Sequence, residues 1–222
     1  MSVIVAIKDK DRIVMGSDKQ GTIGGSKDHT CTKIWEVIGL PGAIMGGVGS
    51  ARVSQILQYS NIIDKNSFCE NIDTAFIITS LTPIIQETLA LNGIKCIVDE
   101  ESISPIPLLP NSFIFAYKDK AWMINNDLSV VEIENYISIG SGSEIAKGVL
   151  YATPKTNPFE RIFTAIEAAA EYTTGVDDRV DILSTEERKT DAKDLCKLLG
   201  VDIPKIKKNF KEFTNEVVDT TN

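Results

Sequence analysis

The chain opens with two apolar runs that alternate as a β-hairpin requires. Val3–Ile7 and Arg12–Gly16 are rich in β-branched residues and are joined by the polar residues Lys8–Asp11. Alternation around a short charged connection predicts two paired strands. A first strand held inside a sheet fixes the N-terminus instead of leaving it to fray. Ser2 would then lie at the mouth of the first strand, with Asp18 just beyond the end of the second.

The next stretch predicts a second pair of strands that leads into a helix. Lys33–Ile38 and Ala43–Gly49 are separated by Gly39–Gly42, where Pro-Gly between apolar runs is a strong turn signal. Apolar residues at helical spacing follow over Ser50–Tyr59. The glycines between strand and helix do not form a dinucleotide-binding motif, because Arg52 stands where GxGxxG needs its third glycine.

The remaining elements come in blocks of helices and blocks of strands. Helices are predicted over Glu70–Asn92 (with Pro83 expected to kink it or to begin a new segment), Glu144–Tyr151 and Pro158–Tyr172. Strands are predicted over Ser112–Tyr117, Ala121–Ile124, Val130–Ile133, Tyr136–Ile139 and Arg179–Ser184, and Asp99–Pro110 is predicted to be a loop. Because helix pairs do not alternate with strands, the order favours an α+β fold. We expect a four-layer αββα sandwich of two antiparallel sheets with helices on both outer sides.

Residues 186–222 depart from this pattern. Two short amphipathic helices are predicted there, and Pro204 lies where the second would begin. We therefore expect a domain over residues 1–185 and a helical C-terminal extension over 186–222. The extension is expected to pack on the domain or on a neighbouring subunit.

Composition narrows the class of protein. The 222 residues carry a net charge of −8, which argues against a nucleic-acid partner, and 43% of them are hydrophobic. No apolar run approaches the roughly 18–20 residues of a membrane span, and no secretory signal begins the chain. Cys31, Cys69, Cys96 and Cys196 lack CxxC spacing, so free thiols in a cytoplasmic protein are expected.

The single histidine of the chain limits the kinds of metal and catalytic site that the sequence can form. His29 is the only histidine, so a metal site built on several histidines is excluded, and we expect no metal and no cofactor. Because His29 lies in the polar stretch Gly21–Thr32, it is expected to be an exposed surface residue. A hydrolase with this sequence would therefore take its base from another group.

Five short features together resemble proteasome β-type subunits and the peptidase subunit of the bacterial ATP-dependent heat-shock protease. They are Gly16-Ser17-Asp18, Lys33-Ile34, Gly46-Gly47, the stretch Ile139–Ser143 and Thr174-Gly175, within a similarity that spans about Ser2–Thr185. Those proteins are N-terminal-nucleophile hydrolases with an αββα fold, assembled into rings. The resemblance implies a homo-oligomeric ring of peptidase subunits that acts on peptides or unfolded protein, fed by an ATPase unfoldase.

The resemblance also implies roles for individual residues. Ser2 takes the place of the catalytic N-terminal threonine once Met1 is removed, and Asp18 and Lys33 match an acidic residue and the lysine that it pairs with. Gly47 matches the oxyanion donor and a substrate contact, Ser141 matches the residue that contacts the α-amine, and Thr22 matches a residue whose backbone pairs with substrate. Glu171 lies where the family has an aspartate, and Thr174 lies where it has a serine.

The chemistry is coherent without the resemblance. A serine hydroxyl is a poor nucleophile until a base takes its proton. A free α-amine has a pKa of roughly 8, and a neighbouring ammonium such as that of Lys33 would lower it and favour the neutral base. Amide hydrolysis through an acyl-enzyme on Ser2 is the expected reaction. A small-molecule amidohydrolase of the same fold and a catalytically silent ring scaffold, which a retained Met1 would favour, remain the alternatives.

Overall fold

A computed structural model gives the fold of residues 2–23, 26–63, 72–98 and 107–186. These residues belong to one compact unit, Met1–Glu186. Met1, Cys69, Cys196 and all of the expected helical extension except Glu186 lie outside the described residues.

A four-stranded antiparallel sheet carries the beginning of the chain. Its strands lie in the order β12 (Tyr136–Gly140), β1 (Val3–Asp9), β2 (Arg12–Asp18) and β13 (Val180–Ser184). The predicted N-terminal hairpin is therefore present, and its first strand is central in the sheet. Ile4 pairs with Ser17, so the end of β2 at Asp18 lies beside Val3 and close to Ser2.

A second antiparallel sheet has five strands. Their order is β11 (Val130–Glu132), β10 (Lys120–Ile124), β9 (Asn111–Tyr117), β6 (Ala43–Gly49) and β5 (Ile34–Glu36). β6 pairs with β9 along its whole length, and the last pair is Gly49 with Asn111. The C-terminal end of β6 and the start of β9 therefore share one edge of the molecule with the helix that follows β6.

Two small hairpins lie outside these sheets. They pair β3 (Gly21–Ile23) with β4 (Ser26–Asp28) and β7 (Ile97–Val98) with β8 (Pro107–Leu108). The first falls in the polar stretch Gly21–Thr32 and the second ends in the segment predicted as a loop. Each of these strands has only two or three residues, which is too few for the alternation that predicts a strand.

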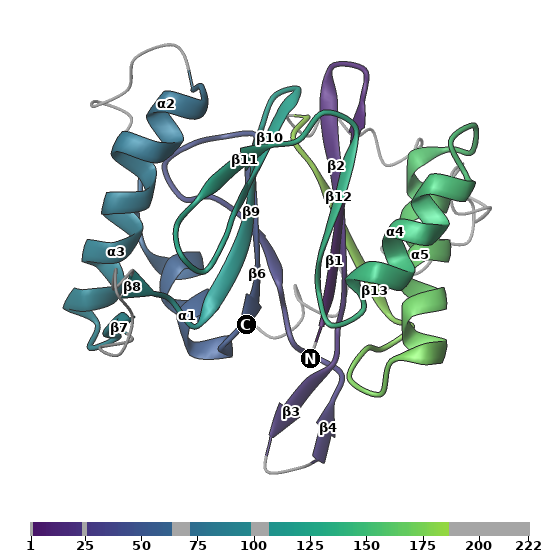
Figure 1. Cartoon of the computed structure of the whole chain (residues 1–222), viewed down its shortest axis with the longest axis horizontal. Helices are drawn as coiled ribbons and strands as arrows, with labels where there is room; N and C mark the ends of the chain where they lie inside the picture. The colour runs from purple at the N-terminus through teal and green to yellow at the C-terminus, as the bar shows by residue number, and fades with distance from the viewer. Residues whose placement is uncertain (1, 24–25, 64–71, 99–106, 187–222) are drawn as a thin grey trace, which may run out of the picture. The chain divides into compact units, whose positions relative to one another are not determined.

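Helices lie beside each of the large sheets (Figure 1). On the five-stranded side are α1 (Ala51–Tyr59), α2 (Thr74–Phe76), the π-helical segment η2 (Ile77–Leu81) and α3 (Thr82–Leu91); on the four-stranded side are α4 (Ser143–Ala152) and α5 (Pro158–Tyr172). Val53, Ile85 and Leu89 pack with Phe113 and Trp122 of the five-stranded sheet. A separate cluster joins α4 and α5 to the four-stranded sheet.

A third cluster packs between the two sheets. Ile4 and Met15 of the first sheet meet Ile44 and Ile114 of the second, and all four are almost completely buried. Each side chain of this size contributes roughly 1.5–3 kcal/mol when it is taken fully out of water. The two sheets are therefore joined by an apolar core, and this core holds the beginning of β1 against β6.

The single helix expected over Glu70–Asn92 is interrupted. It begins at Thr74 within the described residues, passes through the π-helical turn η2 and resumes as α3, whose first turn contains Pro83. Proline has no N–H to donate and clashes with the preceding turn, so the change of hydrogen-bond pattern just before it has a local cause. Pro83 thus begins a new segment, which is one of the two outcomes expected.

The helical stretch Thr74–Leu91 is long and apolar enough to pass a composition test for a membrane span. The same stretch buries Ile77, Leu81, Ile85 and Leu89 against the sheet. Ile78, Ile84 and Leu91 of the same stretch are exposed.

Candidate active site

The backbone of Ser2 is fixed between the end of β12 and the start of α4. Its N–H donates to the Ser141 hydroxyl at 3.1 Å, and its carbonyl accepts from the same hydroxyl at 3.3 Å. The Gly142 N–H donates to that carbonyl at 3.3 Å. Gly140 allows this close approach, because its φ is +100° and a Cβ there would overlap the Ser2 carbonyl. The beginning of the chain is therefore held in one place.

Lys33 and Asp18 form a buried ion pair beside Ser2. Lys33 Nζ lies 2.6 Å from Asp18 Oδ1, and the two side chains are 5% and 0% exposed. The same oxygen accepts from the Val3 N–H at 2.8 Å. Buried charges are costly unless they are paired and hydrogen-bonded, as these are. The ammonium is thus held next to the backbone of the residue that follows Ser2.

The second oxygen of Asp18 is also occupied. Oδ2 accepts from the backbone N–H of Gln20 at 3.1 Å and from that of Asp177 at 3.3 Å. These donors come from distant parts of the chain, one just after β2 and one just before β13. A carboxylate gripped on both oxygens has a fixed orientation, and it therefore orients the ammonium of Lys33.

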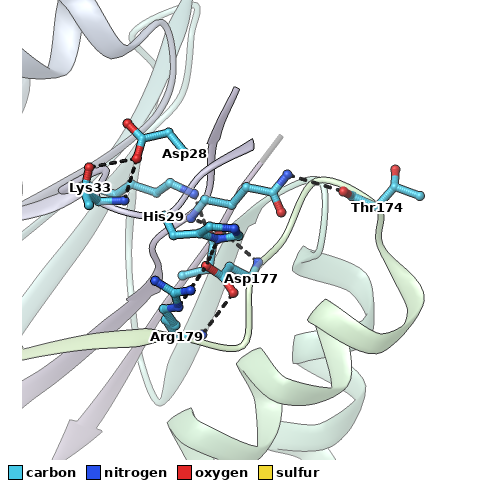
Figure 2. A network of polar contacts seen from close by, with 9 residues as sticks. Asp28, His29, Lys33, Thr174, Asp177 and Arg179 are labelled. Atoms are coloured by element: carbon cyan, nitrogen blue, oxygen red, sulfur yellow. Dashed lines mark hydrogen bonds and ion pairs between the residues drawn. The ribbon is translucent and has the colours of Figure 1, made fainter. Parts of the chain in front are cut away.

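Asp177 connects this pair to a second loop (Figure 2). Its Oδ2 lies 2.6 Å from His29 Nδ1 and 3.9 Å from Arg179 Nε, and its Oδ1 accepts from the Arg179 N–H at 3.5 Å. Burial alone raises the pKa of Asp177. Hydrogen bonds with His29, Asp178 and the Arg179 backbone outweigh that effect and hold the pKa below its usual value.

His29 is not the plain surface residue that the sequence predicts. Its side chain is 36% exposed and its ring faces the Asp177 carboxylate, whose side chain is 8% exposed. The two residues are 148 positions apart. Because the fold alone brings them together, no local pattern in the sequence indicates the contact.

Gly47 is not placed as expected. Its N–H donates to the Lys33 carbonyl at 3.0 Å, and the residue is buried within the sheet. That donor is used to pair β6 with the residue before β5. It is therefore not directed at Ser2, as the role of oxyanion donor would require.

Gly49, two residues after Gly47, borders the space beside Ser2. The Gly47 N–H donates to the Lys33 carbonyl, and the Ala43 carbonyl accepts from the Val37 N–H at 2.9 Å. The odd-numbered residues of β6 therefore direct their backbone polar groups toward the β5 side of the strand. Gly49 continues the alternation past the start of β5 and lines a pocket together with Ser2. It is exposed and has a φ of +125°.

The pocket beside Ser2 has a volume of about 490 Å³. Its lining includes Ser2, Gly49, Pro110, Asn111, Ser112 and Ser141. Gly140 and Asn126 also contribute. Volumes of this size accommodate small ligands or a few residues of a longer one, and polar groups in the lining orient them. The hydroxyl-bearing residue at the start of β1 thus borders a space that a substrate can enter.

Three further predicted site residues are Thr22, Thr174 and Glu171. Thr22 is exposed on β3, opposite Lys27 of β4. The Thr174 carbonyl accepts a hydrogen bond from Gln20 Nε2 at 3.4 Å. The Thr174 side chain points away from His29 and Asp177 (Figure 2). Glu171 is exposed in the last turn of α5 and, among the described residues, makes no hydrogen bond or ion pair with Asp18 or Lys33. The structure does not bring Glu171 into the site.

Within the described residues, no group of three or more His, Cys, Asp or Glu side chains is arranged to hold a metal ion. Cys31 and Cys96 are free thiols.

Comparison with solved structures identifies the fold. BPH from Thiobacillus denitrificans in complex with Epoxomicin is 19% identical, with a TM-score of 0.64 over 83% of this chain and 98% of that chain. Eukaryotic HslV from Trypanosoma brucei is 18% identical, with a TM-score of 0.56 over 82% of this chain and 98% of that chain. The chain has the fold of these proteins.

A mutant of Anbu from Hyphomicrobium sp. strain MC1 shares the fold at 13% identity, with a TM-score of 0.62 over 86% of this chain and 85% of that chain. No family model and no curated protein sequence matches the chain. The resemblance inferred from the sequence is confirmed by structure, at the level of the fold.

Proposed function

We propose that this protein is a proteasome-like peptidase subunit that hydrolyses peptide bonds through Ser2 after removal of Met1. The observation that carries the proposal is the buried Lys33–Asp18 pair, whose shared oxygen also contacts the Val3 N–H beside Ser2. A solvated lysine at a strand start would have no such partner. The shared fold with BPH and HslV adds support.

In the proposed mechanism, Ser2 supplies both the nucleophile and the base. Removal of Met1 turns the nitrogen that now donates to Ser141 into an α-amine. The neighbouring Lys33 ammonium disfavours a second positive charge, so the amine stays neutral and accepts the proton of the Ser2 hydroxyl. The hydroxyl oxygen attacks the peptide carbonyl, and the proton passes to the leaving amine. Water then hydrolyses the ester on Ser2.

The Gly49 N–H is the proposed oxyanion donor, in place of Gly47. Gly49 borders the pocket with Ser2, whereas the Gly47 N–H is bonded to the Lys33 carbonyl. A donor directed at the developing oxyanion is worth about 3–4 kcal/mol of transition-state stabilisation. Any side chain at position 49 would overlap the Pro110 carbonyl, which explains a glycine there.

The proposal extends to architecture and assembly. Helices on the outer side of each large sheet support a four-layer αββα sandwich of the N-terminal-nucleophile type. We propose a cytoplasmic homo-oligomeric ring that receives unfolded protein from an ATPase, with an extended peptide pairing with the backbone at Thr22 on the exposed strand β3. Epoxomicin, bound in the BPH structure, is a suitable first ligand for the pocket beside Ser2.

Substitution of Ser2 tests the proposal directly. Ser2→Ala retains a small second residue, so Met1 is still removed, but the hydroxyl is lost. Turnover of a fluorogenic peptide should fall at least about 10³-fold, because the nucleophile is missing. Ser2→Thr keeps the hydroxyl and should retain measurable turnover, and Ser80→Ala on the outer segment η2 should match the wild type. Unchanged turnover in Ser2→Ala would remove Ser2 from the mechanism, and hydrolysis of small amides alone would favour the amidohydrolase alternative.

A further inference from the structure

Asn111 makes a two-sided contact with the backbone just after Gly49. Its Oδ1 accepts from the Ser50 N–H at 2.9 Å, and its Nδ2 donates to the Ser50 carbonyl at 3.1 Å. Nδ2 also lies 3.4 Å from Ser54 Oγ. The residue is 1% exposed and borders the pocket with Ser2. Both polar atoms of the buried Asn111 carboxamide therefore bind the backbone of one residue, Ser50.

This contact fixes the direction in which the chain leaves β6. Ser50 is the N-cap of α1, but its own side chain makes no capping hydrogen bond. Gly49, just before it, has a φ of +125°, a conformation that glycine alone adopts readily and leaves readily. Without an external restraint this junction would be the freest point between the sheet and the helix. Asn111 supplies the restraint from the neighbouring strand β9, where it pairs with Gly49.

We propose that Asn111 is the positioning residue for the Gly49 N–H, which it holds toward the oxygen that becomes negatively charged during attack by Ser2. This inference rests on the proposed function. A donor that is already oriented before the reaction needs no reorganisation when charge develops, which is what makes oxyanion stabilisation large. Asn111 acts through the two peptide units that follow Gly49, because its side chain bonds both the N–H and the carbonyl of Ser50.

The side chain at 111 must offer a donor and an acceptor at once. Asparagine provides both on one rigid planar group, and aspartate of the same shape provides only acceptors. An aspartate there would leave the Ser50 carbonyl facing another oxygen, so the two-sided contact would open. Alanine would remove both bonds.

The test compares Asn111→Ala and Asn111→Asp with Ser54→Ala. Ser54→Ala deletes the other hydrogen-bond partner of Asn111 Nδ2 and leaves both bonds to Ser50 intact, so it is the matched control. For a fluorogenic peptide, each Asn111 variant should lower kcat at least about tenfold, toward the 10²–10³ loss seen when one oxyanion donor is removed. KM should change less than about twofold, and Ser54→Ala should keep kcat within about twofold of the wild type.

Hydrogen exchange at the Ser50 amide gives a second readout that does not require activity. Protection of that amide should fall in Asn111→Ala and persist in Ser54→Ala. A kcat loss shared equally by Asn111→Ala and Ser54→Ala, or one that only follows the folded fraction, would overturn the positioning role. If Asn111→Ala does not fold, the isosteric Asn111→Asp decides by the same criteria.

The outcome also separates this inference from the proposal beneath it. An active wild type with an unchanged kcat in both Asn111 variants would overturn the role of Asn111 alone. A wild type that cleaves no peptide would overturn the proposed function and the role of Asn111 with it.

Discussion

Lys33 and Asp18 place opposite charges where almost no water reaches them. Their mutual attraction is strong there, but so is the cost of removing each from water, and hydrogen bonds must make up the difference. Asp18 accepts these from Val3, Gln20 and Asp177. A pair that contributes little net stability but fixes an ammonium beside Ser2 is more easily explained by chemistry than by folding.

Replacing Lys33 by methionine should separate stability from activity. Lys33→Met keeps the length of the side chain but leaves the Asp18 carboxylate buried without its cation. We expect a loss of about 3–5 kcal/mol in the free energy of unfolding, measured by urea denaturation, together with loss of peptide hydrolysis.

The double variant Lys33→Met/Asp18→Asn is the control for that experiment. Because it leaves no unpaired buried charge, it should recover part of the lost stability; recovery is incomplete because the new amide nitrogen cannot accept the backbone N–H groups that bind Asp18. It should remain inactive, because no ammonium is left beside the amine of Ser2. A double variant that regained both stability and turnover would show that the pair has no part in the reaction.

At the scale of elements, the strongest sequence signals predicted the structure well. The alternating residues of β1 and β2 and the Pro-Gly turn before β6 describe contacts between neighbours in the chain, and these elements appear where expected. The π-helical turn η2 did not follow from periodicity, because apolar spacing is similar on either side of it. The hairpin of β3 and β4 is not predicted from the sequence, because its six residues are mostly polar and too few to show an alternating pattern.

The candidate site was less accessible to sequence reasoning. Asp18 and Lys33 form an ion pair in the structure, but the sequence links them only through its resemblance to a known family. Among the closely spaced glycines of β6, the pairing with the neighbouring chain occupies the Gly47 N–H, and this register is a property of the folded sheet. The pairing of His29 with Asp177 depends on a contact across most of the chain.

The His29–Asp177 contact joins the loop after β4 to the segment before β13, and it should give stability a dependence on pH. Asp177 has a lowered pKa in the folded protein, so its contribution is present above the ordinary aspartate value of about 3.9 and is lost as the pH falls through the folded pKa. In denaturation series at several pH values, Asp177→Asn should be less stable than the wild type at neutral pH. The difference should shrink below about pH 4.

Asp11→Asn, at an exposed turn, is the matched control and should leave the pH profile unchanged. A difference between wild type and Asp177→Asn that stays constant from pH 7 to pH 3 would contradict the assignment. It would mean that the carboxylate makes no charge-dependent contribution to the fold.

At the scale of the whole molecule, the two sheets bring together what the sequence keeps apart. The core between them holds β1 against β6, so Ser2, Gly49 and Asn111 border one pocket although they come from three strands or strand ends. The same fold is found in BPH and HslV at below 20% identity.

In the proposed mechanism Ser2 becomes the first residue of the chain and carries the acyl group. The most direct measurement is the intact mass of active protein before and after mixing with a slowly hydrolysed peptide ester. We predict a chain that lacks the mass of Met1 and gains one acyl group on the peptide that begins with Ser2. An active chain that keeps Met1, or that carries the acyl group on another residue, would contradict the account.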